Sequence, residues 1–194
     1  MTTLLLVRHG STPWTAERRL QGRTDIALDE RGRAETLALR ALVEPWAPTA
    51  LLVSPAARAM ETAELLRSGS LGALEPRPDE RLLEAGLGEW EGRLPDELGP
   101  DYAAWRAGAL VPPGGERGEL VAARIAAVLD DAAALRGPVL VVTHGGVIRA
   151  ALDRLVGLRT ANLSPVAAAS LTVVEVEQQH GRLRHYNLSA ANAA

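Results

Sequence analysis

The stretch "LLLVRHGSTPW", residues 4–14, joins an apolar run to a charged and polar one. The run before Arg8 is typical of a buried strand, and a histidine and a glycine follow the arginine directly. The stretch "VLVVTHGG", residues 139–146, repeats this order and places His144 after an apolar run. A third stretch, "LLVSPAARAMETA" at 51–63, ends its apolar run at Ser54 and places Arg58 in the first turn of the helix that follows. Three expected strands therefore end in polar side chains.

Strand-like and helix-like segments alternate along the chain, which predicts an α/β fold with a largely parallel sheet. The expected strands cover 3–7, 51–53, 138–142, 168–176 and 182–188, the last two forming a closing pair around His180 and Gly181. The expected helices cover 30–43, 55–67, 119–135 and 146–155, with Asp29 as the N-cap of the first. Residues 77–101 are rich in Gly, Pro and charge and are expected to form loops and short turns.

The composition excludes several classes of protein. The 194 residues carry a net charge of −3, which does not indicate a nucleic-acid or membrane-surface partner. The absence of cysteine excludes disulfides and thiol catalysis and favours a cytoplasmic location, and the sequence contains no apolar run of about 18 residues. All 21 basic residues are arginine, so a P-loop lysine and Schiff-base chemistry are excluded. An oxyanion would have to be bound by arginine side chains and backbone N–H groups.

The three strand ends are expected to meet, because ligands of parallel sheets bind at the carboxyl ends of the strands. Arg8, His9, Arg58 and His144 would then share one pocket. Arginines pair with the spread negative charge of a phosphoryl group, and a neutral imidazole can attack phosphorus. The arginines would also disfavour protonation of His9, and glycine beside each histidine allows close approach of the backbone. Each of these side chains also has a plain structural interpretation as a packed histidine or a solvated arginine.

Phosphoryl transfer also needs a carboxylic acid that protonates the leaving oxygen and later takes a proton from water. The stretch "RLLEAGLGEWEGR", residues 81–93, offers Glu84, Glu89 and Glu91. Glu84 follows an apolar pair as if it ended a short edge strand, whereas the other two are expected in a turn. This position puts Glu84 only slightly ahead.

The motifs "VRHGSTPW", "QGRTDIALDERGRAET", "SPAARAMETA", "LLEAGLGEWEG" and "VTHGGVIRA", in this order, resemble the phosphoglycerate-mutase-like branch of the histidine phosphatase superfamily. The resemblance covers about residues 4–155. It implies a three-layer α/β/α fold with a mixed, mostly parallel sheet, in a single domain over 1–194. It also implies a phosphorylated small-molecule substrate and neither a metal nor another cofactor.

The resemblance assigns a role to each matching residue. His9 would be the phosphorylated nucleophile and Glu84 the general acid and base. Arg8, Arg58 and His144, with Thr15 and Gly145, would bind the phosphate. The chain departs from the family pattern where Ser11 replaces Glu or Gln and where Thr15 replaces an asparagine that helps to hold the phosphate.

The same resemblance favours a phosphatase over a mutase. Mutases of this branch carry a longer insertion between the acid and the second histidine, whereas His144 here comes 60 positions after Glu84. A more open site admits water to a phosphohistidine. Residues 92–118 are expected to form a lid that sets specificity, and the sheet edges to allow a homodimer. A phosphoglycerate mutase and an inactive phospholigand-binding protein are the alternatives.

Overall fold

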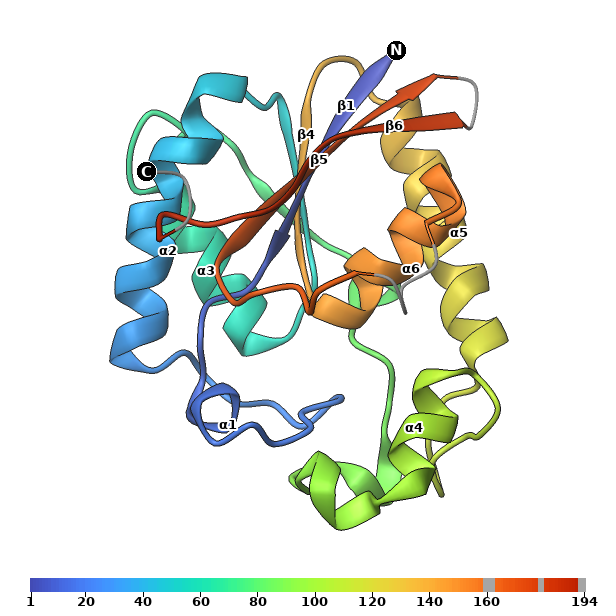
Figure 1. Cartoon of the computed structure of the whole chain (residues 1–194). Helices are drawn as coiled ribbons and strands as arrows, with labels where there is room; N and C mark the ends of the chain where they lie inside the picture. Colours follow the sequence, from blue (N-terminus) through green and yellow to red (C-terminus); the bar gives the residue numbers. More distant parts are fainter. Residues whose placement is uncertain (159–162, 178–179, 192–194) are drawn as a thin grey trace.

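A mixed sheet forms the centre of the computed structural model, which describes residues 1–158, 163–177 and 180–191 (Figure 1). Within these residues the sheet has the strand order β3-β2-β4-β1-β5-β6. The strands are β1 (Thr2–Arg8), β2 (Ala50–Val53), β3 (Pro76–Pro78), β4 (Val139–Thr143), β5 (Ser170–Glu177) and β6 (His180–Leu188). The first four are mutually parallel, and β5 runs antiparallel to β1 and to β6. The predicted α/β fold with a mostly parallel mixed sheet is therefore confirmed.

Helices cover both faces of the sheet because successive strand side chains point to opposite faces. Leu4 and Leu6 of β1 pack with α5 (Gly118–Ala134) and α6 (Gly145–Val156). Leu5 and Val7 face the other way, into a core formed with α2 (Glu30–Val43) and α3 (Ala57–Arg67). The continuous apolar runs of the central strands follow from this arrangement, since both faces are buried. In the described residues no helix is both long and apolar enough to cross a membrane.

The helices begin and end near the expected positions, but some of their predicted inner faces are wrong. Asp29 caps α2 as expected, accepting a hydrogen bond from the backbone N–H of Gly32 at 2.6 Å. Leu37 and Leu120 fit the apolar helical spacing of 30–43 and 119–135, which predicts that they face inward, yet they are 44% and 59% exposed. The sheet decides which stripe of each helix is covered, and the spacing of alanines and leucines alone does not.

The segment ends show three further differences. Pro55 precedes α3 instead of lying in its first turn, because the helix begins only at Ala57. His180 and Gly181 are the first residues of β6 and not its turn, and residues 178–179 lie outside the described residues. β3 (Pro76–Pro78) is an edge strand where a loop was expected, a position that tolerates proline because one side needs no hydrogen bond.

Residues 87–110 build a small apolar cluster of their own. It contains α4 (Pro100–Arg106) and two 3₁₀ turns, and lies beyond the carboxyl ends of the strands with the short helix α1 (Pro13–Ala16) nearby (Figure 1). Its residues are Leu87, Trp90 and Leu98, packed by Leu20, Tyr102, Trp105 and Leu110. This cluster and the chain up to α5 overlap residues 92–118, and the role of these residues as a lid stays a prediction.

A close approach between two glycines fixes the loop after β1 on the start of α2. A Cβ placed on Gly10 would lie 2.5 Å from the carbonyl oxygen of Gly32. A Cβ placed on Gly32 would lie 2.0 Å from the carbonyl oxygen of Ser11. Both contacts are with backbone atoms, which cannot move aside as a side chain can. The position of the loop after His9 therefore depends on the missing Cβ atoms.

The same substitution is expected to have opposite effects on two helices. Gly32→Ala should lower the free energy of unfolding by about 2 kcal/mol, because the added methyl group overlaps the backbone of Ser11. Gly118→Ala, in the first turn of α5, meets no atom within 4 Å and should raise the free energy of unfolding by up to about 1 kcal/mol. Urea unfolding of the two variants tests this, and equal effects would contradict the close approach.

Candidate active site

Two buried histidines meet at the carboxyl edge of the sheet. His9 follows β1, and His144 is the N-cap residue of α6 directly after β4. The strands β1 and β4 are neighbours, and the ring centroids of the two histidines lie 5.2 Å apart with 63° between their planes. They are 3% and 1% exposed. The repeated strand-histidine motif thus places both rings in one site, as the sequence predicted.

The ring of His9 is held in the tautomer that a nucleophile needs. Its Nδ1 donates a hydrogen bond to the carbonyl oxygen of Gly10 at 2.8 Å. The proton of the neutral ring is therefore on Nδ1, and Nε2 keeps its lone pair. Burial, followed by the charges of Arg8 and Arg58, holds the pKa of His9 well below its usual value. The ring is therefore neutral at pH 7.

Two arginines of the site have buried donors without acceptors. Arg58, in the first turn of α3 and 1% exposed, donates from its two terminal nitrogens to the carbonyl oxygens of Thr24 at 2.9 Å and Gly22 at 2.8 Å. Arg8 donates to the carbonyl oxygen of Val166. The buried Nε atoms of both arginines have no hydrogen-bond partner among the described residues. Burial lowers the pKa of each guanidinium, but arginine stays charged.

His144 adds a third nitrogen of this kind. Its Nε2 lies 2.8 Å from the hydroxyl of Ser54, at the end of β2, while its buried Nδ1 has no partner in the described part of the chain. If Ser54 donates, the neutral ring carries its proton on Nδ1 and can donate it to a ligand. Burial, followed by His9, Arg58 and Arg8, lowers the pKa of His144 well below its usual value. Buried donors without acceptors are costly, and an oxyanion would satisfy all three.

Glu84 is the carboxylate of this site. Its Oε2 accepts a hydrogen bond from the N–H of Gly146 at 2.9 Å, in the first turn of α6. It is also the largest favourable charge acting on both Arg8 and Arg58. The sequence suggested that Glu84 ends a short edge strand. In the structure Glu84 instead follows the 3₁₀ turn Glu80–Leu82. Its role as general acid and base stays a prediction.

The other two candidate acids have different surroundings. Glu89 is exposed in a 3₁₀ turn. Glu91 accepts hydrogen bonds from the N–H groups of Thr24 at 2.7 Å, Arg23 at 2.9 Å and Leu87 at 3.1 Å. Burial opposes its ionisation, but these hydrogen bonds outweigh burial and lower its pKa. Glu91 therefore fixes the loop that wraps the guanidinium of Arg58.

The two glycines after His144 differ in how much space the neighbouring side chains leave for a Cβ atom. A Cβ on Gly145 would lie 3.5 Å from Nε of Arg8, which is an ordinary contact. A Cβ on Gly146 would lie 2.3 Å from Oε1 of Glu84, so this second glycine is the one that Glu84 requires. Binding of phosphate by Gly145 stays a prediction.

Thr15 belongs to a neighbouring hydrogen-bond cluster. Its hydroxyl completes the cap of α1 with Thr12, and the side-chain amide of Gln21 donates to it at 2.9 Å. Phosphate binding by Thr15 therefore stays a prediction, and its hydroxyl is already engaged. Gln21 is the first residue of the motif "QGRTDIALDERGRAET" but was given no role, and its Oε1 is buried without a partner among the described residues.

A charged network lies against the backbone of Leu83 and Glu84. Glu116 is bound by Arg124 at 2.9 and 3.0 Å and by Arg23 at 3.1 Å. Arg124 also donates to the carbonyl oxygens of Arg81 and Leu83, both at 2.6 Å, which fixes the backbone just before Glu84. Two arginines share one carboxylate here, so the border of the site is positively charged.

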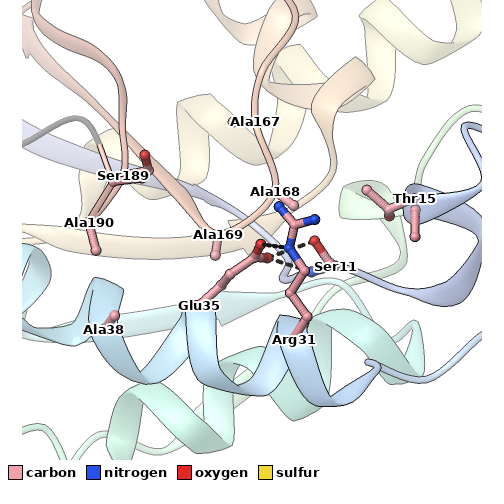
Figure 2. Close-up of a pocket in the computed structure, with 12 residues that line it drawn as sticks. Ser11, Thr15, Arg31, Glu35, Ala38, Ala167, Ala168, Ala169, Ser189 and Ala190 are labelled. Carbon is pink, nitrogen blue, oxygen red and sulfur yellow. Dashed lines mark hydrogen bonds and ion pairs between the residues drawn. The ribbon is translucent and has the colours of Figure 1, made fainter.

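A pocket of about 490 Å³ lies against helix α2 (Figure 2). It is lined by Ser11 and Thr15, by Arg31 and Glu35 of α2, and by residues 167–169 and 189–191. Neither histidine lines it. Figure 2 shows the side chains of Glu35, Arg31 and Ser11 close together at this pocket, joined by dashed lines.

Comparison with known proteins gives a consistent picture. The family model described as histidine phosphatase superfamily (branch 1) matches residues 4–189. A glucosyl-3-phosphoglycerate phosphatase of Mycobacterium tuberculosis is 33% identical in an alignment 174 positions long that covers 82% of this chain and 77% of that protein. An Erwinia tasmaniensis protein named "Probable phosphoglycerate mutase GpmB" is 32% identical in an alignment 169 positions long that covers 81% of this chain and 76% of that protein.

A solved structure agrees with the fold over nearly the whole chain. The mycobacterial glucosyl-3-phosphoglycerate phosphatase in complex with vanadate superposes with a TM-score of 0.85 and 32% identity. The match covers 95% of this chain and 98% of that one. The complex shows that a protein of this fold binds a phosphate-like oxyanion.

The lowered pKa values of the two histidines are expected to make stability depend on pH. Between about pH 7.5 and pH 5 the unfolded chain, with histidine pKa values near 6.5, takes up protons that the folded protein does not. The free energy of unfolding should therefore fall as the pH falls. His144→Asn should reduce this slope by up to about 1.4 kcal/mol per pH unit in urea unfolding, and His9→Asn should act in the same direction. Slopes equal to that of the wild type would contradict the burial of neutral rings.

Proposed function

This chain belongs to branch 1 of the histidine phosphatase superfamily, and on that premise we propose that it is a metal-independent phosphomonoesterase of small phosphorylated metabolites. The observation that carries the proposal is the set of three buried nitrogens without acceptors, on Arg8, Arg58 and His144, together with the free Nε2 of His9, whose ring lies 5.2 Å from that of His144. A phosphoryl group supplies oxygens for the three donors and a phosphorus atom for the nucleophile. The vanadate complex of the mycobacterial relative supports this choice of ligand.

The reaction takes two steps. Nε2 of His9 forms a bond to phosphorus while the ester P–O bond breaks, and Glu84 gives its proton to the departing oxygen. Water then attacks the phosphohistidine, Glu84 takes a proton from it, and the P–N bond breaks to release inorganic phosphate. Arg8, Arg58 and His144 stabilise the charge on the phosphoryl oxygens in both steps. Arginine charge does the work that a metal ion does in other phosphatases, so no metal or cofactor is required.

Hydrolysis is favoured over mutase activity because only 60 positions of sequence separate Glu84 from His144. Residues 92–118 form the wall of the site that sets specificity, and the positive charge of Arg23 and Arg124 borders it. A mutase must keep water from its phosphohistidine, which takes a longer covering segment. A phosphoglycerate mutase is the first alternative, in keeping with the name of the Erwinia relative. An inactive phospholigand-binding protein is the second, since Thr15 stands where the family has asparagine.

The first test is hydrolysis of p-nitrophenyl phosphate in excess EDTA. We expect the wild type to stay active and His9→Ala to fall to background, because no other group can form the phosphorylated intermediate. His185→Ala, which removes an exposed histidine of β6, is the control and should keep full activity. Activity retained by His9→Ala would contradict the proposed nucleophile.

The same preparation separates the alternatives. Conversion of a phosphoglycerate that depends on a bisphosphate primer would indicate a mutase. Thermal stabilisation by phosphorylated compounds without release of phosphate would indicate a binding protein.

The role of Glu84 predicts a dependence on the leaving group. With an alkyl phosphate, whose departing oxygen needs a proton, Glu84→Gln should lower kcat/KM by about 10²- to 10³-fold. With p-nitrophenyl phosphate, which releases a stable anion, kcat/KM should fall by less than about tenfold. Glu89→Gln, at the exposed acid five positions later, should change neither value. Equal losses on both substrates would mean that Glu84 does not protonate the leaving group.

A further inference from the structure

The peptide unit between Gly10 and Ser11 links the nucleophile to a carboxylate that the motifs did not single out. Its carbonyl oxygen accepts the hydrogen bond from Nδ1 of His9 at 2.8 Å. Its N–H lies in the same peptide plane, points the opposite way and donates to Oε2 of Glu35 at 3.3 Å. The hydroxyl of Ser11 donates to the same oxygen at 2.7 Å. One peptide group therefore separates the carboxylate of Glu35 from the imidazole of His9.

Glu35 is fixed from both sides. It lies in the second turn of α2, where Nε of Arg31 donates to its Oε1 at 2.6 Å, as Figure 2 shows. The glycine contact between Gly10 and Gly32 holds the loop on this helix, so that the carboxylate can reach the backbone of Ser11. The side chain of Glu35 is 25% exposed, and it lines the pocket of about 490 Å³ described above.

We propose that Glu35 is a positioning residue for His9 that acts through the Gly10–Ser11 peptide group, an inference that rests on the proposed function. Hydrogen bonds in series polarise one another, so a carboxylate on the peptide N–H makes the carbonyl oxygen a stronger acceptor. That acceptor keeps the proton on Nδ1 and leaves Nε2 free to attack. It also supports the positive charge that the ring gains when Nε2 binds phosphorus.

This contribution opposes the other charges around the ring. Arg8 from β1 and Arg58 from α3 both disfavour a positive His9, and His144 faces it from α6. The charge of Glu84 raises the pKa of both arginines. The arginines keep His9 neutral before attack, whereas Glu35 supports the ring after attack. The charge of Glu35 also raises the pKa of Arg8 through space, but Glu35 makes no hydrogen bond to the ring of His9, so its hydrogen-bonded link to that ring passes through the backbone.

The test compares two carboxylates at the two ends of α2. Glu35→Gln keeps the size of the side chain and an oxygen for Ser11 but removes the charge. Glu44→Gln is the matched control, because Glu44 also pairs with an arginine four positions earlier, at 3.4 Å, and accepts a serine N–H, from Ser70 at 3.3 Å. Both variants lose one helix ion pair, but only Glu35 is linked to a histidine. Equal midpoints of thermal unfolding verify that the pair is matched.

We expect Glu35→Gln to lower kcat for p-nitrophenyl phosphate about tenfold, the lower end of the effect of removing an orienting partner, with KM changed less than twofold. The acid limb of kcat/KM should also move to lower pH, because loss of the negative charge disfavours the protonated ring. Glu44→Gln should leave both unchanged. A loss of activity without movement of the acid limb, or the same loss in both variants, would overturn the proposal.

A second measurement does not depend on turnover. The chain has four histidines, so the ¹⁵N signals of His9 can be assigned by comparison with His9→Asn. The wild type should show the proton on Nδ1, and Glu35→Ala should show a larger share of the Nε2–H form. An unchanged tautomer in Glu35→Ala would contradict the link even if the protein hydrolyses no phosphoester. Absence of hydrolysis by the wild type with the expected tautomer change would instead contradict the proposed function alone.

Discussion

The backbone from His9 to Ser11 has a hydrogen-bond partner for every N–H and C=O group, and the geometry of the site depends on this. In chain order the partners of these groups are Thr143, Ala169, Thr62, the ring of His9, Glu35 and Asp29. They come from β4, from the chain before β5, from α3 and from the start of α2. β4, which ends one residue before His144, and α3, which carries Arg58, thus also hold the backbone around His9. Preorganisation of this kind is needed for a group that must meet phosphorus along one line.

The charges of the site follow a second constraint. A buried arginine normally has a carboxylate hydrogen-bonded to it, because an uncompensated buried charge is costly. Arg8 and Arg58 instead donate to carbonyl oxygens and keep Nε unpaired. Glu84 acts on both from a distance while its own oxygens are bound by backbone N–H groups. The site therefore holds positive charge that is oriented by dipoles and available to an anion.

Much of this could be predicted from the sequence, because an apolar run followed by a histidine marks a strand end and parallel strand ends meet. His9, His144 and Arg58 were found in this way, and the order of strands β2, β4 and β1 explains why they converge. Local pattern failed where tertiary contacts decide the outcome. Leu37 and Leu120 fit a helical stripe but lie outside the faces that the sheet covers. Glu35 and Gln21 lie inside the motif "QGRTDIALDERGRAET" but were given no role, because their importance comes from contacts with residues 6 to 24 positions away.

The apolar cluster of residues 87–110 shares no residue with the two cores that flank the sheet. Substitutions of its apolar residues therefore change the packing of this small cluster and not the packing of the two cores that hold the strands. The cluster, which we propose as part of the wall of the site, is therefore packed apart from the strand ends that hold His9 and His144. Its shape can change while the two cores that flank the sheet keep their packing.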